Sequence, residues 1–195
     1  MAKKGRRRQD HLARRARHEG YRARSVYKLE EIDGKYDLLG RRGVRVLDLG
    51  AAPGSWSQYA VGRGALVVAV DLQEITVAGA TCITGDFTEP GVIERIVERG
   101  PFDLVLSDAA PATTGNRVID TGRSEALVES ILAGLDRWLV PDGALVAKLF
   151  QGGAEQELRR EVQERFRKGV LFRPDAVRRE SFETYLVGIG FTGAA

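Results

Sequence analysis

The chain has 195 residues, 43% of them hydrophobic, and carries a formal net charge of +3 at pH 7. This length suits one domain with a hydrophobic core, and no apolar run is long enough to cross a membrane. The single cysteine, Cys82, excludes a disulfide framework and favours a reducing cytoplasm. Because both histidines, His11 and His18, lie near the N-terminus, we expect neither a zinc site nor a Ser-His-Asp hydrolase, and no metal site at all.

The positive charge is concentrated at the N-terminus. Residues 1–28 contain eleven Lys and Arg against Asp10 and Glu19, a net charge of +9, whereas the rest of the chain has a net charge of −6. Such a segment favours a polyanionic partner, and its many arginines, which pair with phosphates and stack on bases, favour RNA. The alternative is a solvated tail that maintains solubility. We therefore predict a basic arm over residues 1–24, flexible up to about residue 20, and a folded domain over residues 25–195.

After the basic arm, the apolar pattern predicts an amphipathic helix over 25–39 and then an alternation of strands and helices. Runs of apolar β-branched residues alternating with helices indicate an α/β fold with a mostly parallel sheet covered on both faces. A hairpin is the simplest connection between the last two strands, so we expect one antiparallel strand at that edge. Strands are predicted at 44–49, 66–71, 81–84, 104–107, 144–149, 170–172 and 184–188, and helices at 55–62, 91–99, 122–139 and 154–166.

The segment 48–56, DLGAAPGSW, follows the first predicted strand. Its small residues let the backbone approach a ligand, and the next helix offers free N–H groups. The segment fits the dinucleotide pattern G-x-G-x-x-G poorly, because Pro53 has no N–H to donate to a pyrophosphate. A cofactor without a pyrophosphate, such as S-adenosylmethionine, suits it better. The alternative is a tight turn without a ligand.

Acidic residues follow the next three predicted strands. Asp71 ends the second strand, Asp86 follows the third and Asp108 follows the fourth. Ligands of open α/β sheets bind beyond these strand ends, where Asp71 can accept ribose hydroxyls and Asp86 can meet an adenine edge. Each aspartate alone is equally well explained as a turn former or helix cap, but three in succession favour a nucleoside site. Trp56 either flanks the cofactor or packs at the helix start.

Lys148 interrupts the apolar strand ALVAKLF. A lysine inside a central strand is costly to bury unless a carboxylate pairs with it, and Asp108 and Glu183 are the candidates. A lysine in such a place can serve as a general base. The alternative is a lysine that reaches solvent at the end of the strand. Glu183 and Lys28, taken alone, are better explained as solvated positions than as functional residues.

The order RSVYKL, DLGAAPGSW, AVD, GDF, SDAAP, AKLF and SFETYL resembles the FtsJ/RlmE-type ribosomal RNA 2′-O-ribose methyltransferases over residues 22–187. The resemblance implies a Rossmann-like sheet of seven strands and S-adenosylmethionine as cofactor. In that family the loop often reads APGGW, and here Ser55 replaces the second glycine. Because serine tolerates and can cap a helix start, we expect cofactor binding to persist.

The resemblance also implies roles for individual residues. Lys148 corresponds to the proton acceptor for the ribose 2′-hydroxyl. The whole catalytic tetrad corresponds to Lys28, Asp108, Lys148 and Glu183, and the cofactor contacts correspond to Gly54, Trp56, Asp71, Asp86 and Asp108.

The implied function is 2′-O-methylation of a uridine in the 23S rRNA of the large ribosomal subunit. The expected partner is this rRNA within an assembled large subunit, with no membrane partner, and we expect a cytoplasmic monomer. Two alternatives remain open: a tRNA or cap 2′-O-methyltransferase, which the tetrad does not distinguish, and a non-catalytic RNA-binding ribosome assembly protein.

Overall fold

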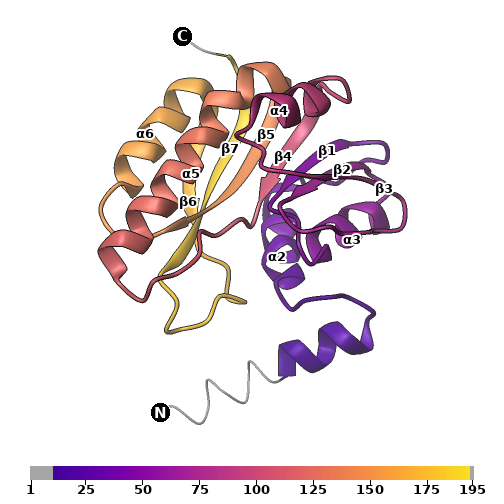
Figure 1. Ribbon diagram of the computed structural model, residues 1–195, viewed down its shortest axis with the longest axis horizontal. Helices are drawn as coiled ribbons and strands as arrows, with labels where there is room; N and C mark the ends of the chain where they lie inside the picture. The colour runs from indigo at the N-terminus through magenta and orange to yellow at the C-terminus, as the bar shows by residue number, and fades with distance from the viewer. Residues whose placement is uncertain (1–10, 194–195) are drawn as a thin grey trace.

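The structure is a computed structural model that describes residues 11–193 (Figure 1). Seven strands form one sheet in the order β3-β2-β1-β4-β5-β7-β6. The strands are β1 (Arg45–Leu49), β2 (Leu66–Asp71), β3 (Ala80–Thr84), β4 (Phe102–Ser107), β5 (Leu139–Phe150), β6 (Phe166–Phe172) and β7 (Glu183–Phe191). The helices are α2 (Val26–Tyr36), α3 (Ser55–Gly62), α4 (Pro90–Val97), α5 (Arg117–Trp138) and α6 (Glu155–Arg165).

The predicted α/β architecture is confirmed. Strands β1 to β5 pair in parallel, and β7 pairs antiparallel with both β5 and β6. The antiparallel strand predicted at this side of the sheet is therefore β7, and β6 lies outside it. The register of β5 and β7 places Lys148 opposite Tyr185 and Phe150 opposite Glu183.

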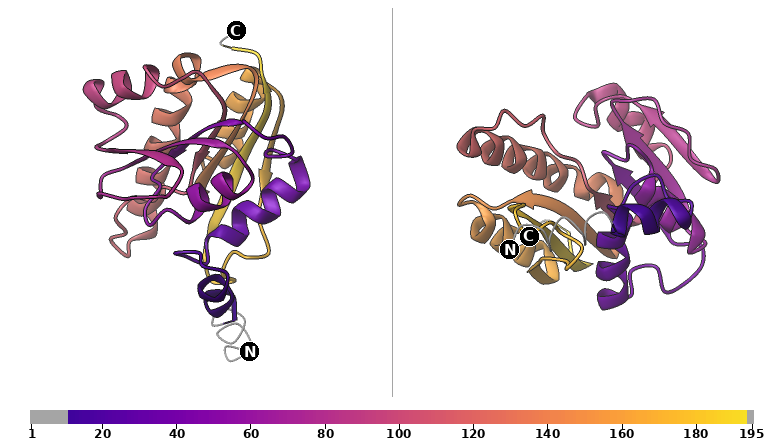
Figure 2. Two further views of the ribbon diagram at one scale, coloured as in Figure 1. Left: turned by 90° about the vertical axis from the view of Figure 1, so that its right-hand side faces the viewer. Right: turned by 90° about the horizontal axis from the view of Figure 1, so that it is seen from below.

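Helices cover both faces of the sheet (Figures 1 and 2). One buried apolar cluster joins the sheet to α4, α5 and α6, and a second joins it to α2 and α3. Each strand of the sheet centre contributes to both clusters because successive side chains point to opposite faces. None of the helices within residues 11–193 is both long and apolar enough to cross a membrane.

The loops that follow β1 and β4 approach each other closely. Gly50 follows β1 with φ of 70°, and a Cβ at this position would lie 2.4 Å from the Cβ of Ala109, which follows β4. Only glycine allows both this backbone conformation and this contact. Gly54, with φ of 105°, then turns the chain into α3.

Several elements begin earlier than predicted, among them α5, β5 and β6 (Phe166 instead of residue 170). Helix α5 starts at Arg117 because the side chain of Asn116 accepts hydrogen bonds from the backbone N–H groups of Val118 and Ile119. Strand β5 starts at Leu139 and passes through a Pro-Asp-Gly sequence in which Asp142 has φ of 66°. Such residues normally mark a turn, which is why the sequence predicted a later start.

The prediction of a flexible arm was wrong over residues 11–18, which form a helix. Ala16 is 1% exposed and packs against Val26, Tyr27 and Ala176. The hydroxyl of Tyr27 donates a hydrogen bond to Glu19 (2.9 Å). These contacts fix the second half of the basic arm to α2, whereas the prediction for residues 1–10 lies outside the described part of the chain.

Candidate active site

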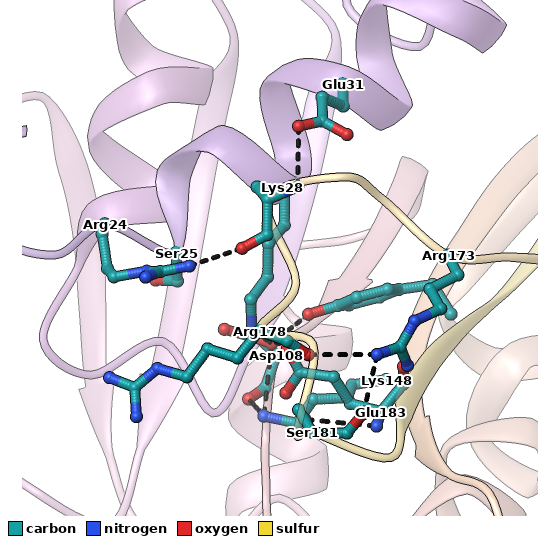
Figure 3. Close-up of polar contacts among 12 residues, drawn as sticks. Arg24, Ser25, Lys28, Glu31, Asp108, Lys148, Arg173, Arg178, Ser181 and Glu183 are labelled. Carbon is teal, nitrogen blue, oxygen red and sulfur yellow. Dashed lines mark hydrogen bonds and ion pairs between the residues drawn. The ribbon is translucent and has the colours of Figure 1, made fainter. Parts of the chain in front are cut away.

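Four charged side chains from separate parts of the sequence meet at one end of the sheet (Figure 3). Lys28 lies on α2, Asp108 follows β4, Lys148 lies on β5 and Glu183 begins β7. Lys28 Nζ lies 2.7 Å from Glu183 Oε1 and 3.6 Å from Asp108 Oδ1, and Lys148 Nζ lies 3.2 Å from Asp108 Oδ1. The four form a chain of alternating charges, Lys148–Asp108–Lys28–Glu183, which we call the charged cluster.

Lys148 is buried as the strand pattern predicted, with a side chain that is 8% exposed. Its Nζ donates a hydrogen bond to the backbone oxygen of Asp108 (2.5 Å) in addition to the ion pair. A carboxylate and a carbonyl together offset the cost of removing the ammonium from water. Glu183, the second carboxylate considered for Lys148, forms its ion pair with Lys28 instead.

Asp108 is the centre of the charged cluster. Burial raises the pKa of its carboxyl group, but the charges of Lys148 and Lys28 and a hydrogen bond from Tyr185 outweigh burial, and the net shift is downward. The Tyr185 hydroxyl donates that bond to Oδ1 (2.7 Å), and burial raises the pKa of Tyr185 well above its ordinary value. Asp108 is therefore ionised at neutral pH while Tyr185 keeps its proton.

Tyr185 was not among the predicted site residues. It lies two residues after Glu183 on β7, and residues two apart on a strand share one face of the sheet. This two-residue period is the sequence signal that could have identified Tyr185 as a site residue. The ring of Tyr185 also packs against Trp56, with 5.8 Å between ring centroids.

A cavity of about 440 Å³ opens beyond the ends of the parallel strands. Asp71 lies at its edge, where Oδ2 accepts a hydrogen bond from the Ala52 N–H and Oδ1 accepts one from the Gln73 N–H, both at 2.8 Å. Asp86 also lines the cavity while its Oδ1 accepts hydrogen bonds from the Thr88 N–H and hydroxyl. Both aspartates therefore form turns and face the cavity. The lining also includes Gly50, Ala52, Gly85, Phe87, Asp108, Ala109 and Pro111.

Gly54 and Trp56 lie at the start of α3, outside the described lining of this cavity. Trp56 is 2% exposed, and its Nε1 donates a hydrogen bond to the backbone oxygen of Ser25 (2.9 Å). The Ser55 hydroxyl lies 2.9 Å from the Ser25 hydroxyl, so this serine joins α3 to the start of α2 rather than capping α3. These contacts support the interpretation that Trp56 packs at the start of the helix. That Gly54 and Trp56 contact a cofactor remains a prediction.

A second cavity, of about 370 Å³, is bounded by the Lys28–Glu183 ion pair. It is lined by Arg24, Ser25, Lys28, Arg178, Glu180, Ser181 and Glu183. The first cavity contains Asp108 and the second contains Lys28 and Glu183. The charged cluster therefore connects a strand-end cavity with a basic cavity.

Together these features define a Rossmann-like methyltransferase fold with a strand-end cavity next to the charged cluster. The chain matches the FtsJ-like methyltransferase family over residues 21–191, and it belongs to that family.

Individual relatives agree with this assignment. The ribosomal RNA large subunit methyltransferase E of Treponema denticola is 42% identical over 191 residues, which cover 94% of this chain and 96% of the relative. The protein with the same name from Syntrophobacter fumaroxidans is 46% identical over 187 residues, which cover 92% and 94%.

Solved structures show the same architecture. The crystal structure of a ribosomal RNA methyltransferase, putative by its own description, from Plasmodium falciparum has a TM-score of 0.79 at 26% identity and covers 89% of this chain and 100% of that one. Human methyltransferase-like protein 13, in complex with SAH, has a TM-score of 0.57 at 15% identity, covers 80% and 75%, and shows the fold alone.

Proposed function

We propose that this protein transfers the methyl group of S-adenosylmethionine to the 2′-oxygen of a uridine ribose in the 23S rRNA of the large ribosomal subunit. The observation that carries the proposal is the charged cluster, which lies between the two cavities and holds a buried lysine against an ionised carboxylate. The names of the relatives support large-subunit rRNA as the acceptor.

The first cavity fits S-adenosylmethionine better than a dinucleotide. Its volume lies within the range of small-molecule sites. Asp71 is held by two backbone N–H groups in a position to accept the hydroxyls of a ribose, and the Gly50 backbone leaves room for a ligand. Pro53 supplies no N–H for a pyrophosphate. Membership of the FtsJ-like methyltransferase family supports a methyl-donor cofactor of this type.

When bound, S-adenosylmethionine supplies an electrophilic methyl group on sulfur. A ribose 2′-hydroxyl is a poor acid, so its proton must be removed as the oxygen attacks. In our proposal Lys148 first releases to solvent one proton of the ammonium that pairs with Asp108. The resulting amine would accept the 2′-hydroxyl proton as the oxygen attacks the methyl group that bound S-adenosylmethionine would supply, with S-adenosylhomocysteine as the leaving group. Asp108 then stabilises the ammonium that results, because its carboxylate lies 3.2 Å from Lys148 Nζ.

Lys28 and Glu183 act on the acceptor side of this scheme. Their ion pair, at 2.7 Å, fixes Lys28 Nζ within 3.6 Å of Asp108 and at the wall of the second cavity. In this position Lys28 orients the ribose and a neighbouring phosphate toward Lys148. The partner we propose is the rRNA within an assembled large subunit, and the proposed protein is a cytoplasmic monomer.

The experiment is transfer of a tritiated methyl group from S-adenosylmethionine to large-subunit RNA. We expect wild-type protein to label this RNA and Lys148→Ala to abolish labelling while it binds S-adenosylmethionine nearly as well, because Lys148 is absent from the first cavity's described lining. Lys168→Ala is the matched control, since this exposed lysine lies on β6 outside the charged cluster.

Other outcomes would contradict the proposal. Turnover by Lys148→Ala at the wild-type rate would exclude Lys148 as the base. Labelling of tRNA or capped RNA in place of large-subunit RNA would favour a different acceptor, and binding without labelling of any RNA would favour a non-catalytic assembly protein.

A further inference from the structure

The second cavity has a wall whose position is fixed by side-chain hydrogen bonds although it lacks regular secondary structure. This wall is the connection between β6 and β7, residues 173–182. The Arg173 guanidinium donates hydrogen bonds to the backbone oxygens of Glu183 (2.5 Å), Ser181 (2.7 Å) and Arg178 (3.1 Å) (Figure 3). One guanidinium therefore holds the C-terminal half of the connection against the start of β7.

Side chains from α2 and the residues before it hold the other half. The Glu31 carboxylate accepts hydrogen bonds from the N–H groups of Asp175 (2.5 Å) and Ala176 (2.9 Å). Arg24 donates one to the backbone oxygen of Ala176 (2.5 Å). Because the connection is tied at several points, the side chains on it are presented in fixed positions before any ligand binds, which reduces the entropy lost on binding.

Arg178 is the cation that this wall presents to the second cavity. Its backbone oxygen is engaged by Arg173, while its side chain is exposed and lines the cavity. In Figure 3 the guanidinium extends away from Lys148 and Asp108. It is therefore placed to meet a ligand that enters from solvent toward the charged cluster.

The charges of the cavity suit a phosphodiester. Lys28 and Glu183 neutralise each other at 2.7 Å, and Arg24, Arg178 and Glu180 leave an excess of one positive charge. A guanidinium can donate two parallel hydrogen bonds to the oxygens of a phosphate. We infer that Arg178 binds a backbone phosphate of the RNA beside the nucleotide whose ribose reaches the charged cluster.

This inference rests on the proposed function and adds a residue that binds the acceptor. Its test compares wild-type protein with Arg178→Ala, Arg178→Lys and Arg179→Ala. Arg179 is the matched control because it is the next residue, is also exposed and is not among the described residues that line the cavity. The measurements are KM and Kd for large-subunit RNA at several salt concentrations, with the Tm and the Kd for S-adenosylmethionine for each variant.

We expect Arg178→Ala to raise the Kd and KM for RNA about 10-fold, the loss associated with one charge-assisted hydrogen-bonded contact. The slope of log Kd against log salt should fall by about 0.7, the value for one phosphate contact on single-stranded RNA. Arg178→Lys should retain the salt slope but lose part of the affinity, because its ammonium lacks the guanidinium fork. Arg179→Ala should behave like the wild type.

Equal RNA affinity and salt slope for Arg178→Ala and Arg179→Ala would overturn the inference while leaving methyl transfer by the wild type intact. If Arg178→Ala lost RNA affinity but also had a lower Tm or weaker S-adenosylmethionine binding, the inference would be overturned too, since the role of Arg178 would then be structural. Failure of the wild type to methylate large-subunit RNA would instead overturn the proposed function.

Discussion

Asp108 shows how a single side chain sets the character of the site. Its carboxylate accepts the Tyr185 hydrogen bond and faces both lysines of the charged cluster. Because two cations share one buried anion, neither lysine is fully neutralised by Asp108 alone, and Glu183 supplies the second negative charge beside Lys28. This division of partners leaves Lys148 with the carboxylate that lines the first cavity.

In a second buried acid, Asp48, the pKa is shifted upward, whereas that of Asp108 is shifted downward. It lies on β1, is 1% exposed, and its Oδ1 lacks a hydrogen-bond partner among the described residues. Its pKa is raised from 3.8 to about 7, chiefly by burial and further by the charges of Asp108 and Asp71, while hydrogen bonds from Ser57 oppose the shift. Asp48 is thus partly protonated near neutral pH.

This shift predicts a pH-dependent effect of Asp48→Asn on stability. Between pH 4 and 7 the folded protein keeps a proton that the unfolded chain has lost, so wild-type stability falls as the pH rises through this window and levels off above it. The neutral asparagine has no such dependence. The difference in unfolding free energy, Asp48→Asn minus wild type, should therefore rise by about 2–3 kcal/mol between pH 5 and pH 8. Urea unfolding at the two pH values measures it, and a constant difference would show that Asp48 is ionised throughout.

At the scale of elements, the local pattern predicted most of the sheet. The apolar β-branched runs of β1 and β2 place those strands within one residue of their observed bounds. Patterns of this kind act within one element, which is why they predict strands well. Contacts between distant elements leave no such pattern. Lys28 taken alone resembled a solvated helix position, and only the fold brings it to Glu183 near the other end of the chain.

The turn between the last two strands was predicted, but neither the hydrogen bonds that hold the 173–182 connection nor the helix at 11–18 was. Arg173 and Glu31 resemble surface charges in sequence, yet both bind backbone groups of the connection. The helix at 11–18 is rich in arginine and histidine, and it presents only Leu12 and Ala16 to the small apolar cluster. Two apolar residues are too few to give a helical period.

The docked helix makes a prediction about truncation. Deleting residues 1–20 removes the packing of Ala16 and the partner of the Tyr27 hydroxyl, so we expect the free energy of unfolding to fall by about 1–3 kcal/mol. Deleting residues 1–10 spares these contacts and should leave stability at the wild-type value. Thermal or urea unfolding of the two truncated proteins distinguishes them. Equal stability of both would mean that the helix adds nothing to the folded domain.

At the scale of the whole molecule, the helix at 11–18 and the second cavity lie at the same end. The helix at 11–18 packs against Ala176, which belongs to the wall of that cavity (Figures 1 and 2). The acidic remainder of the chain carries a net charge of −6. We expect this asymmetry to direct a polyanion toward the cavity that Lys28 and Arg178 line.

Removal of residues 1–10 tests this charge distribution while every residue of the helix at 11–18 stays in the chain. The deletion removes five basic residues (two Lys and three Arg) and one acidic residue, Asp10. We expect weaker binding to large-subunit RNA and a shallower dependence of log Kd on log salt, because fewer counterions are released. Unchanged affinity for RNA across the salt range would show that residues 1–10 do not bind RNA and serve at most as a solubility tail.

The most direct measurement of the central claim is the chemical identity of the methylated product. Large-subunit RNA lacking the modification is incubated with the protein and S-adenosylmethionine, digested to nucleosides and analysed, and the modified position is mapped. We predict one product, 2′-O-methyluridine, at a single position of the 23S rRNA, absent with Lys148→Ala. A methyl group on a base, or on the ribose of tRNA alone, would contradict the account.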